Sequence, residues 1–178
     1  MRLAADRLRR GGVVAYPTES VFGLGCNPLN KRAVMRLLAI KHRDPGKGVI
    51  LISHDFEQLR DFVAKVPSER LAAVLAQWPG PTTWLLPAAP WVPDWLTGEH
   101  ETLAMRVTAH PIAAALCRAA GMALVSTSAN LSGRPPARTP LQVRARCEGN
   151  LDMVLHGQTG GLARPTRIRD ALNDRWIR

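Results

Sequence analysis

The sequence predicts an α/β protein built on a mixed sheet. Short apolar runs typical of buried strands alternate along the chain with longer segments whose apolar residues recur at helical spacing. The 178 residues, 46% of them hydrophobic, suffice for one domain with a substantial core, or at most two small ones. Because no internal repeat or low-complexity linker divides them, we expect the strands and helices to share one domain.

The first quarter of the chain contains two expected helices and two expected strands. The basic segment 1–10 carries its apolar residues at helical spacing and is closed by two glycines. Residues 13–16, Val-Val-Ala-Tyr, predict a buried strand that a proline ends. Asn30 is a suitable N-cap for a helix that runs to about residues 41–43, where Asp-Pro-Gly breaks it. The apolar residues 49–52 predict the next strand.

The middle of the chain continues the alternation. Residues 55–62 and 68–78 predict two helices, and a rigid Pro-Gly-Pro turn precedes the strand expected at 83–86. Residues 102–107 predict another strand. The following helix, 111–120, has proline in its first turn and ends at a glycine.

The last third begins with a short buried strand at residues 123–125. This strand leads into small hydroxyl and amide residues at 126–130, which we expect to form a loop at its carboxyl end. Ligands bind at such strand ends in open α/β sheets. A helix is expected at 139–147, and short late strands are expected at 153–155, 167–169 and 175–177.

The charge of the chain points to partners that carry phosphate. The formal net charge is +10, and only four of the 24 basic residues are lysines. The planar guanidinium fork of arginine matches pairs of phosphate oxygens. The alternative is an arginine-rich composition that gives only a solvated basic surface, because net charge governs non-specific association and not fold.

Three separated cysteines, Cys26, Cys117 and Cys147, lack any C-x-x-C pair. They indicate a reducing compartment rather than a disulfide or zinc framework, so we expect no metal ligands among the side chains. No signal-peptide pattern opens the sequence and no apolar run approaches 18 residues. We therefore expect a cytoplasmic protein without a membrane partner.

Several common motifs are absent. Gly23-Leu24-Gly25 lacks the third glycine of a dinucleotide fingerprint, and Gly46-Lys47-Gly48 lacks the spacing and hydroxyl of a Walker A loop. No G-x-S-x-G elbow is present, which argues against a serine hydrolase.

Six local strings occur in a fixed order across almost the whole chain. They are YPTESVFGLG at 16–25, KHR at 41–43, PGPTT at 79–83, RVTAHP at 106–111, STSANLSG at 126–133 and PTRIRD at 165–170. In sequence and order these strings resemble the YrdC-like family of threonylcarbamoyl-AMP synthases, in its short, single-domain form. We therefore expect one YrdC-like domain over residues 1–178.

The resemblance implies both a fold and a reaction. The fold is a twisted, open α/β sheet with flanking helices and a basic concave face. The reaction is the condensation of L-threonine, bicarbonate and ATP to threonylcarbamoyl-AMP and pyrophosphate, with Mg²⁺ accompanying ATP. The product feeds the threonylcarbamoyladenosine modification of tRNA, so downstream tRNA-modifying proteins are implied partners.

Four residues match the family's signature and are expected to carry the ATP and substrate chemistry: Lys41, Arg43, Ser128 and Asn130. Judged from the residues alone, Lys41 and Arg43 either neutralise a polyphosphate or are ordinary cations at a helix carboxyl end. Ser128 and Asn130 either orient phosphate or close a local turn.

Six further residues are implied to bind threonine or ATP: Thr18, Thr83, Arg106, Ser126, Thr166 and Arg178. Simpler explanations exist for several of them. Thr18 can cap a turn, Arg106 can form a surface ion pair, and Arg178 can be a frayed terminus. The chain also departs from the family at Leu51, where many relatives carry a histidine that helps to hold threonine.

Two alternatives belong to other functional classes. The first is a non-catalytic RNA-binding module whose basic groove holds tRNA or duplex RNA by phosphate contacts, which would make binding strongly salt-dependent. The second is a regulatory or carbamoyl-handling protein that only binds nucleotide.

Overall fold

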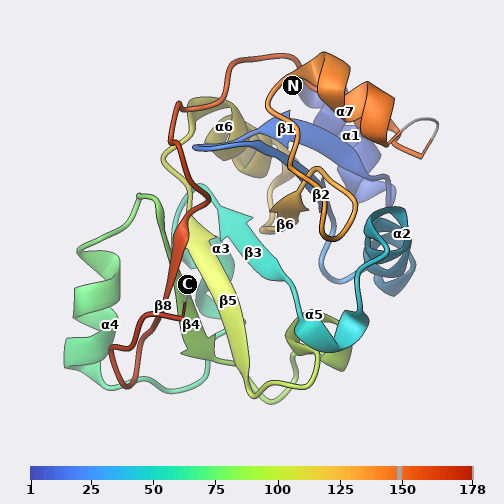
Figure 1. Cartoon of the computed structure of the whole chain (residues 1–178). Coiled ribbons are helices and arrows are strands. Elements are labelled where there is room, and N and C mark those ends of the chain that lie inside the picture. The colour runs from blue at the N-terminus through green and yellow to red at the C-terminus, as the bar shows by residue number, and fades with distance from the viewer. Residues whose placement is uncertain (148–149, 178) are drawn as a thin grey trace.

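An eight-stranded mixed sheet runs through the molecule in the order β7-β1-β2-β6-β3-β5-β4-β8 (Figure 1). The computed structural model describes residues 1–147 and 150–177. The strands are β1 (Val14–Pro17), β2 (Phe22–Cys26), β3 (Ile50–Ser53), β4 (Thr82–Pro87), β5 (Thr102–Val107), β6 (Leu124–Ser128), β7 (Met153–Val154) and β8 (Arg167–Asp170). The expected mixed α/β fold with an open sheet is confirmed.

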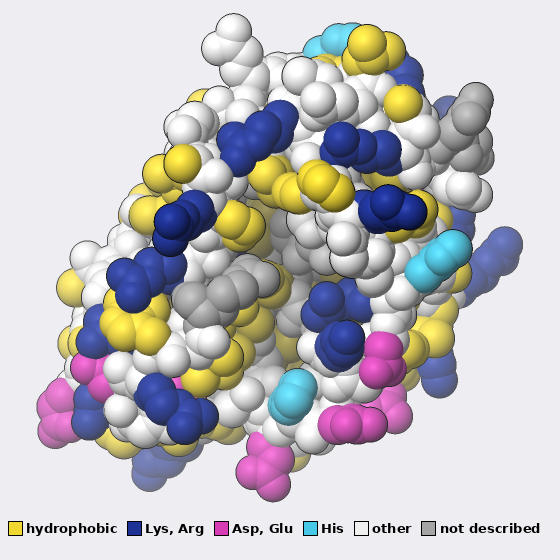
Figure 2. All heavy atoms as spheres, viewed as in Figure 1, with side chains coloured by type: hydrophobic (Ala, Val, Ile, Leu, Met, Phe, Trp, Pro, Cys, Tyr) yellow, Lys and Arg dark blue, Asp and Glu magenta, His cyan; other side chains and the backbone are white. Residues whose placement is uncertain are grey.

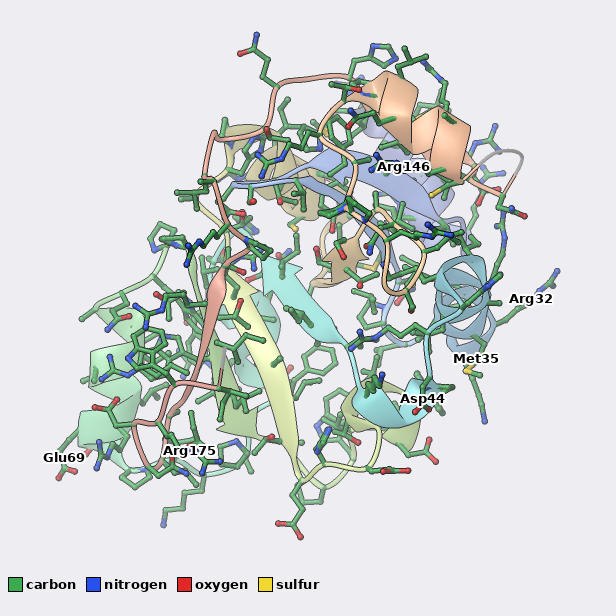
Figure 3. The ribbon with its side chains drawn as sticks, in the orientation of Figure 1. Arg32, Met35, Asp44, Glu69, Arg146 and Arg175 are labelled. Atoms are coloured by element: carbon green, nitrogen blue, oxygen red, sulfur yellow. The ribbon has the colours of Figure 1, made fainter. Side chains whose placement is uncertain are left out.

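Helices flank this sheet, and Figure 3 adds the side chains to the same view. The helices are α1 (Arg2–Arg9), α2 (Lys31–Lys41), α3 (Glu57–Arg60), α4 (Ser68–Leu75), α5 (Asp94–Thr97), α6 (Pro111–Ala120) and α7 (Pro140–Arg146), and a 3-10 turn covers Pro45–Lys47. Asn30 caps α2 as predicted, because its side-chain oxygen accepts a hydrogen bond from the Ala33 N–H at 3.0 Å. No helix in the described part of the chain is long and apolar enough to cross a membrane.

Side-chain alternation along β3 and β6 divides the core into two clusters. Leu51 and Val125 belong to the larger cluster, together with residues of α2 and α5. Ile52 and Leu124, one position away on each strand, belong to the smaller cluster with α1 and α6. Successive residues of a strand point to opposite faces of a sheet, so the two clusters lie on opposite sides of it.

The face that α1 and α6 cover continues beyond these helices. Ile50 and Ser126 lie two positions from Ile52 and Leu124 and therefore point to the same side; they are opposite each other in the antiparallel register of β3 and β6. Both line a cavity. The helices thus cover only one part of this sheet face, and the remainder forms the cavity floor.

The central strand β6 is longer than predicted. Residues 126–128 were expected in a loop, but they pair with Gly23–Gly25 of β2, and Ser126 also pairs with Ile50 of β3. Because β2 pairs with all three residues and β3 also pairs with Ser126, strand pairing overrides the local preference of serine for turns.

Three smaller differences concern short elements. Helix α3 covers Glu57–Arg60, less than the predicted 55–62, and α5 (Asp94–Thr97) was not predicted at all. Residues 175–177 form no named strand; instead Trp176 makes a single bridge to Arg169. Helices of four residues are too short for periodicity to reveal them.

Gly25 permits the close approach of β2, Tyr16 and β6. A Cβ atom at this position would lie 2.7 Å from Tyr16 Cε1 and 2.7 Å from the Val125 carbonyl oxygen. We expect Gly25→Ala to lower the free energy of unfolding by about 1–3 kcal/mol, the usual cost of overpacking a core. Urea denaturation measures this loss.

Gly121→Ala is the matched control, since a Cβ there meets nothing within 4 Å although its φ is +71°. Only the cost of a left-handed residue applies to it, roughly 1 kcal/mol. A Gly25→Ala protein at least as stable as Gly121→Ala would contradict the prediction.

Candidate functional site

A cavity of about 490 Å³ opens on the sheet face beside α6, and Figure 2 shows the hollow near the middle of this side of the molecule. Its floor comes from β3, β5 and β6, and its walls come from the β1–β2 connection, the turn after α2, α5 and β8. The described residues that line it are Thr18, Ser20, Val21, Phe22, Gly23, Arg43, Lys47, Gly48, Val49, Ile50, Leu85, Leu96, Thr97, His100, Thr102, Ala104, Arg106, Ser126, Thr127, Ser128, Asn130, Pro136, Pro165, Thr166, Ile168 and Ile177.

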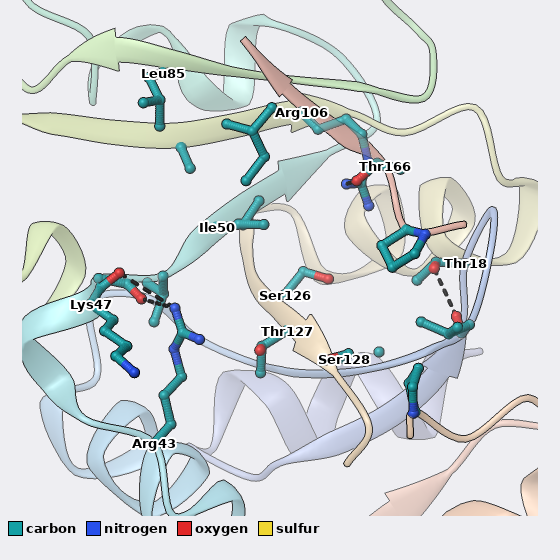
Figure 4. A pocket seen from close by; sticks show the side chains of 18 of the residues that line it. Thr18, Arg43, Lys47, Ile50, Leu85, Arg106, Ser126, Thr127, Ser128 and Thr166 are labelled. Carbon is teal, nitrogen blue, oxygen red and sulfur yellow. Dashed lines mark hydrogen bonds between the residues drawn. The ribbon is translucent and has the colours of Figure 1, made fainter. Parts of the chain in front are cut away.

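The polar groups of the cavity gather at two ends (Figure 4). Arg43 and Lys47 lie at one end, and Thr18, Arg106 and Thr166 lie at the other. Among the described lining residues there is no aspartate or glutamate. The cavity therefore offers cations and hydroxyls to a ligand, which suits an anionic molecule.

Lys41 joins the two sequence stretches that carry the four signature residues. Its ammonium donates to the Asn130 carbonyl at 2.8 Å, to Asn130 Oδ1 at 2.9 Å and, by a short contact, to the Ser128 carbonyl. Its own carbonyl accepts from the Ser132 N–H at 2.9 Å. The end of α2 is thus fastened to the segment after β6.

The Lys41 ammonium is buried and does not line the cavity. Three protons meet three acceptors, so all of its hydrogen-bonding capacity is used within the protein. Burial, with a smaller contribution from nearby Arg43, lowers the pKa of Lys41 from 10.5 to about 8. In this arrangement the Lys41 ammonium faces the segment after β6 rather than the cavity.

Arg43, by contrast, reaches the cavity. The left-handed conformation of His42, with φ 50°, redirects the chain after the helix. The Arg43 Nη2 donates to the Gly48 carbonyl at 3.0 Å, which fixes the guanidinium against the following turn (Figure 4). Only one residue separates Lys41 from Arg43, yet the Lys41 side chain contacts Asn130 and the Arg43 side chain lines the cavity.

Ser128 and Asn130 are held rigidly at the cavity wall. The Ser128 hydroxyl donates to Asn130 Oδ1 at 2.5 Å, and Asn130 Nδ2 donates to the carbonyls of Leu131 at 2.9 Å and Arg134 at 2.6 Å. Asn130 thus closes the loop after β6, as the turn interpretation of this residue expects, and it also lines the cavity.

At the other end, Arg106 is fixed by two hydroxyls. Its Nη1 donates to Thr166 Oγ1 at 2.9 Å and to Thr83 Oγ1 at 3.1 Å. Thr83 is fully buried and is not among the lining residues, and its hydroxyl contacts Arg106. Thr18 donates to the Val21 carbonyl at 2.7 Å, which closes its turn while its side chain still borders the cavity.

Sequence reasoning did not single out Lys47, which lines the cavity, or Glu19, which is buried beside Arg106. The contacts of Glu19 show why it is buried. Its Oε2 lies 3.4 Å from Arg106 Nη2, and its Oε1 accepts from the Thr108 hydroxyl at 2.6 Å. Both partners come from β5 or the residue directly after it, far along the chain. The signal in the sequence was the position of Glu19 between two apolar runs. An acidic residue in such a position is buried only when it is paired, so the position could have indicated a buried ion pair.

Three other expected positions complete the comparison. Ser126 lines the cavity, and Arg178 lies outside the described residues. Leu51 packs into the larger core cluster on the opposite face of the sheet, while its neighbour Ile50 lines the cavity. The described residues contain no group of three His, Cys, Asp or Glu side chains suited to hold a metal ion.

The chain is similar to known proteins over nearly its whole length. The family model for Sua5, YciO and YrdC, described as telomere recombination, matches residues 6–178. The threonylcarbamoyl-AMP synthase of Methylococcus capsulatus is 56% identical over 180 residues, covering 100% of this chain and 96% of that protein. The enzyme of the same name from Xanthomonas campestris pv. campestris is 52% identical over 177 residues, covering 98% of this chain and 95% of that protein.

Solved structures agree in fold. The crystal structure of P. abyssi Sua5 complexed with L-threonine superimposes with a TM-score of 0.89 and 34% identity, covering 95% of this chain and 50% of that one. The crystal structure of E. coli YciO gives a TM-score of 0.87 and 31% identity, covering 99% of this chain and 85% of that one. The chain thus spans half of the Sua5 chain and most of YciO.

The burial of Lys41 predicts an unusual titration. We expect its Nζ resonance to titrate with a midpoint of about 8 instead of the ordinary 10.5. The folded state then binds fewer protons than the unfolded state between these values, so this group makes the free energy of unfolding rise with pH across that interval.

NMR of lysine side-chain nitrogens measures this directly, since the chain has only four lysines. The signal that disappears in Lys41→Met identifies the residue. A midpoint near 10.5 in the folded protein would show that the ammonium is solvated and not enclosed by its three acceptors.

Proposed function

Because the chain belongs to the Sua5/YciO/YrdC family, we propose that it is a nucleotidyltransferase that makes threonylcarbamoyl-AMP and pyrophosphate from L-threonine, bicarbonate and ATP. One observation carries the proposal: the stretches 41–43 and 126–130 meet at a single cavity with a cationic end and a hydroxyl-rich end. A triphosphate and an amino acid together require such an arrangement. The relatives with 52–56% identity carry the name of this enzyme.

Each end of the cavity is assigned to one substrate. Arg43 and Lys47 neutralise the phosphates of ATP, and Ser128 and Asn130 orient them from the end of β6 and the loop that follows it. Lys41 contributes by holding the Ser128–Asn130 segment in place. This division keeps the four signature residues in one functional unit, although they act in different ways.

Threonine is assigned to the other end. Arg106 binds its carboxylate, while Thr18 and Thr166 supply hydroxyls for its polar groups and Thr83 supports Arg106 from behind. Ser126, on the floor between the ends, lies where the two substrates approach each other. Arg178 is proposed as a further nucleotide contact from the sequence match alone. The P. abyssi structure with L-threonine supports an amino-acid site in this fold.

The chemistry requires no protein nucleophile. The threonine amine bonds to the carbon of bicarbonate and water leaves, which gives a carbamate. A carbamate oxygen then attacks the α-phosphorus of ATP, and the bond to the departing pyrophosphate breaks. The protein's task is to hold the anions together, to neutralise the developing charge and to exclude water from a labile intermediate. Leu85, Ile168 and Ile177 give the cavity an apolar wall that serves this last purpose.

Mg²⁺ is proposed only as the companion of ATP. Protein-bound Mg²⁺ usually takes one or two carboxylates in addition to substrate phosphates. The described lining of this cavity contains hydroxyls but no carboxylate, so we assign no residue to the metal and derive no step through it. The ion would reach the site on the phosphates.

The proposed domain extent, compartment and partners follow from the same reaction. We propose one domain over residues 1–178, acting in the cytoplasm and passing its product to tRNA-modifying proteins. The net charge of +10 supports contact with tRNA or duplex RNA as an addition to catalysis. The named relatives favour an enzyme, with any RNA contact secondary to catalysis, over a non-catalytic RNA-binding module.

Pyrophosphate release tests the proposal. Purified protein should release pyrophosphate only when ATP, bicarbonate and L-threonine are all present. Arg43→Ala and Asn130→Ala should each lower the rate by at least about 100-fold, because each removes a pre-positioned polar group of the kind that costs 10²–10³ in rate when lost. Lys41→Ala should act equally strongly through the loop that it holds. Turnover of ATP that ignores threonine, together with tight RNA binding, would favour the binding-module alternative.

Arg106→Lys tests the assignment of the threonine end. Lysine keeps the charge beside Glu19 but loses the planar fork, so the KM for L-threonine should rise about 10- to 100-fold, as expected for the loss of hydrogen bonds to a charged group. The KM for ATP should stay within about twofold. Steady-state kinetics in each substrate separate the two constants, and an equal rise in both would remove Arg106 from the threonine site.

A further inference from the structure

We propose that Glu19 is a positioning residue for threonine recognition: its carboxylate sets the orientation of the Arg106 guanidinium that receives the substrate carboxylate. The inference rests on the proposed function and deepens it. It assigns a role to a residue that touches neither cavity nor substrate.

Burial shows that Glu19 acts on protein groups. Its side chain belongs to a residue only 6% exposed, and Arg106 is 5% exposed. Arg106 lines the cavity, whereas Glu19 does not. Glu19 therefore lies behind Arg106 as seen from the ligand, in the position of a support.

The guanidinium is held from two sides. Glu19 Oε2 faces Nη2 at 3.4 Å, while Thr166 and Thr83 accept from Nη1 at 2.9 and 3.1 Å. The supports come from the β1–β2 connection, from β4 and from the residue before β8. A planar group that is hydrogen-bonded at one terminal nitrogen and ion-paired at the other is restricted in rotation, so its direction toward the cavity is set before a ligand arrives.

Glu19 is itself oriented. The Thr108 hydroxyl donates to Oε1 at 2.6 Å, and the same oxygen of Thr108 accepts from the His110 N–H at 3.2 Å. The carboxylate therefore presents its other oxygen to Arg106. Thr108, Glu19 and Arg106 form a chain of contacts that ends at the cavity.

Charge gives this arrangement a second consequence. A buried guanidinium without a counter-ion is strongly disfavoured, and a paired carboxylate is what allows Arg106 to stay charged at a nearly closed position. With its charge already balanced, Arg106 recognises a carboxylate through directed hydrogen bonds more than through net attraction. Such recognition favours a planar carboxylate over a loosely placed anion.

Glu19→Gln is the direct test in the full-length protein. Glutamine keeps the size and an acceptor for Thr108 but removes the charge, so the KM for L-threonine in the pyrophosphate assay should rise about tenfold. The KM for ATP should change less than about twofold. Glu57→Gln, at an exposed acid paired with Arg60 on α3, is the matched control and should leave both constants unchanged.

A double-mutant cycle separates positioning from general support. If Glu19 acts through Arg106, Glu19→Gln should add little to the threonine KM of Arg106→Lys, because the two residues form one unit. Additive effects of the two substitutions on the threonine KM would show that Glu19 has only a structural role. The same conclusion would follow if Glu19→Gln lowered kcat and the thermal midpoint and raised both KM values equally. An unchanged threonine KM in Glu19→Gln would overturn the inference outright.

Thr108→Val provides the milder variant, should Glu19→Gln fail to fold. It removes only the hydroxyl that orients the carboxylate, and the threonine KM should rise about threefold with an unchanged ATP KM. No change in this variant would overturn the inference. A wild-type protein that releases no pyrophosphate from the three substrates would overturn the proposed function and this inference together, whereas an active wild type with indifferent variants would overturn the inference alone.

Discussion

The enclosed ammonium of Lys41 is the interaction on which the rest of the site depends. A buried cation is tolerated only when its protons find acceptors, and here all three acceptors belong to Ser128 and Asn130. Since Lys41 is the last residue of α2, this contact sets the distance between the helix end and the loop after β6. Loss of the side chain would leave buried acceptors unsatisfied, at a cost of about 1–3 kcal/mol each. Arg43 is brought to the cavity by the same helix end, so one contact places both cations relative to the loop.

The two ends of the cavity share a physical principle. At one end Arg43 is fastened to the carbonyl of Gly48, and at the other Arg106 is held by Thr166 and by the carboxylate of Glu19. In both places the protein has already met the cost of ordering a long side chain before any ligand binds. Groups that need no reorganisation at the moment of reaction stabilise developing charge most effectively. The fold therefore supplies rigidity where the chemistry requires it, at strand ends and at the first turn after a helix.

Features with local causes were predictable from the sequence, and features with distant causes were not. The Asn30 cap and the end of α2 follow from neighbouring residues, and the structure has them as expected. The strand character of Ser126 depends on β2 and β3, which lie far away in the sequence, so local propensity assigned it to a loop. The inward turn of the Lys41 ammonium and the burial of Glu19 also depend on residues about 90 positions away. The stretches 41–43 and 126–130 carry the four residues that were expected to share one ATP and substrate site, and the coordinates show that the two stretches are in contact.

Side-chain alternation along the central strands separates residues that line the cavity from residues that build the larger core cluster. Ile50 and Ser126 shape the cavity, while Leu51 and Val125, their immediate neighbours, pack in the hydrophobic core on the opposite face. Substitution of Ser126 changes the ligand environment and spares the larger core cluster, whereas substitution of Leu51 or Val125 does the reverse. Ligand preference can therefore drift during evolution, or be redesigned in the laboratory, at the cavity end of this face, as at Ser126, whereas Ile52 and Leu124 further along the same face are held by the smaller core cluster.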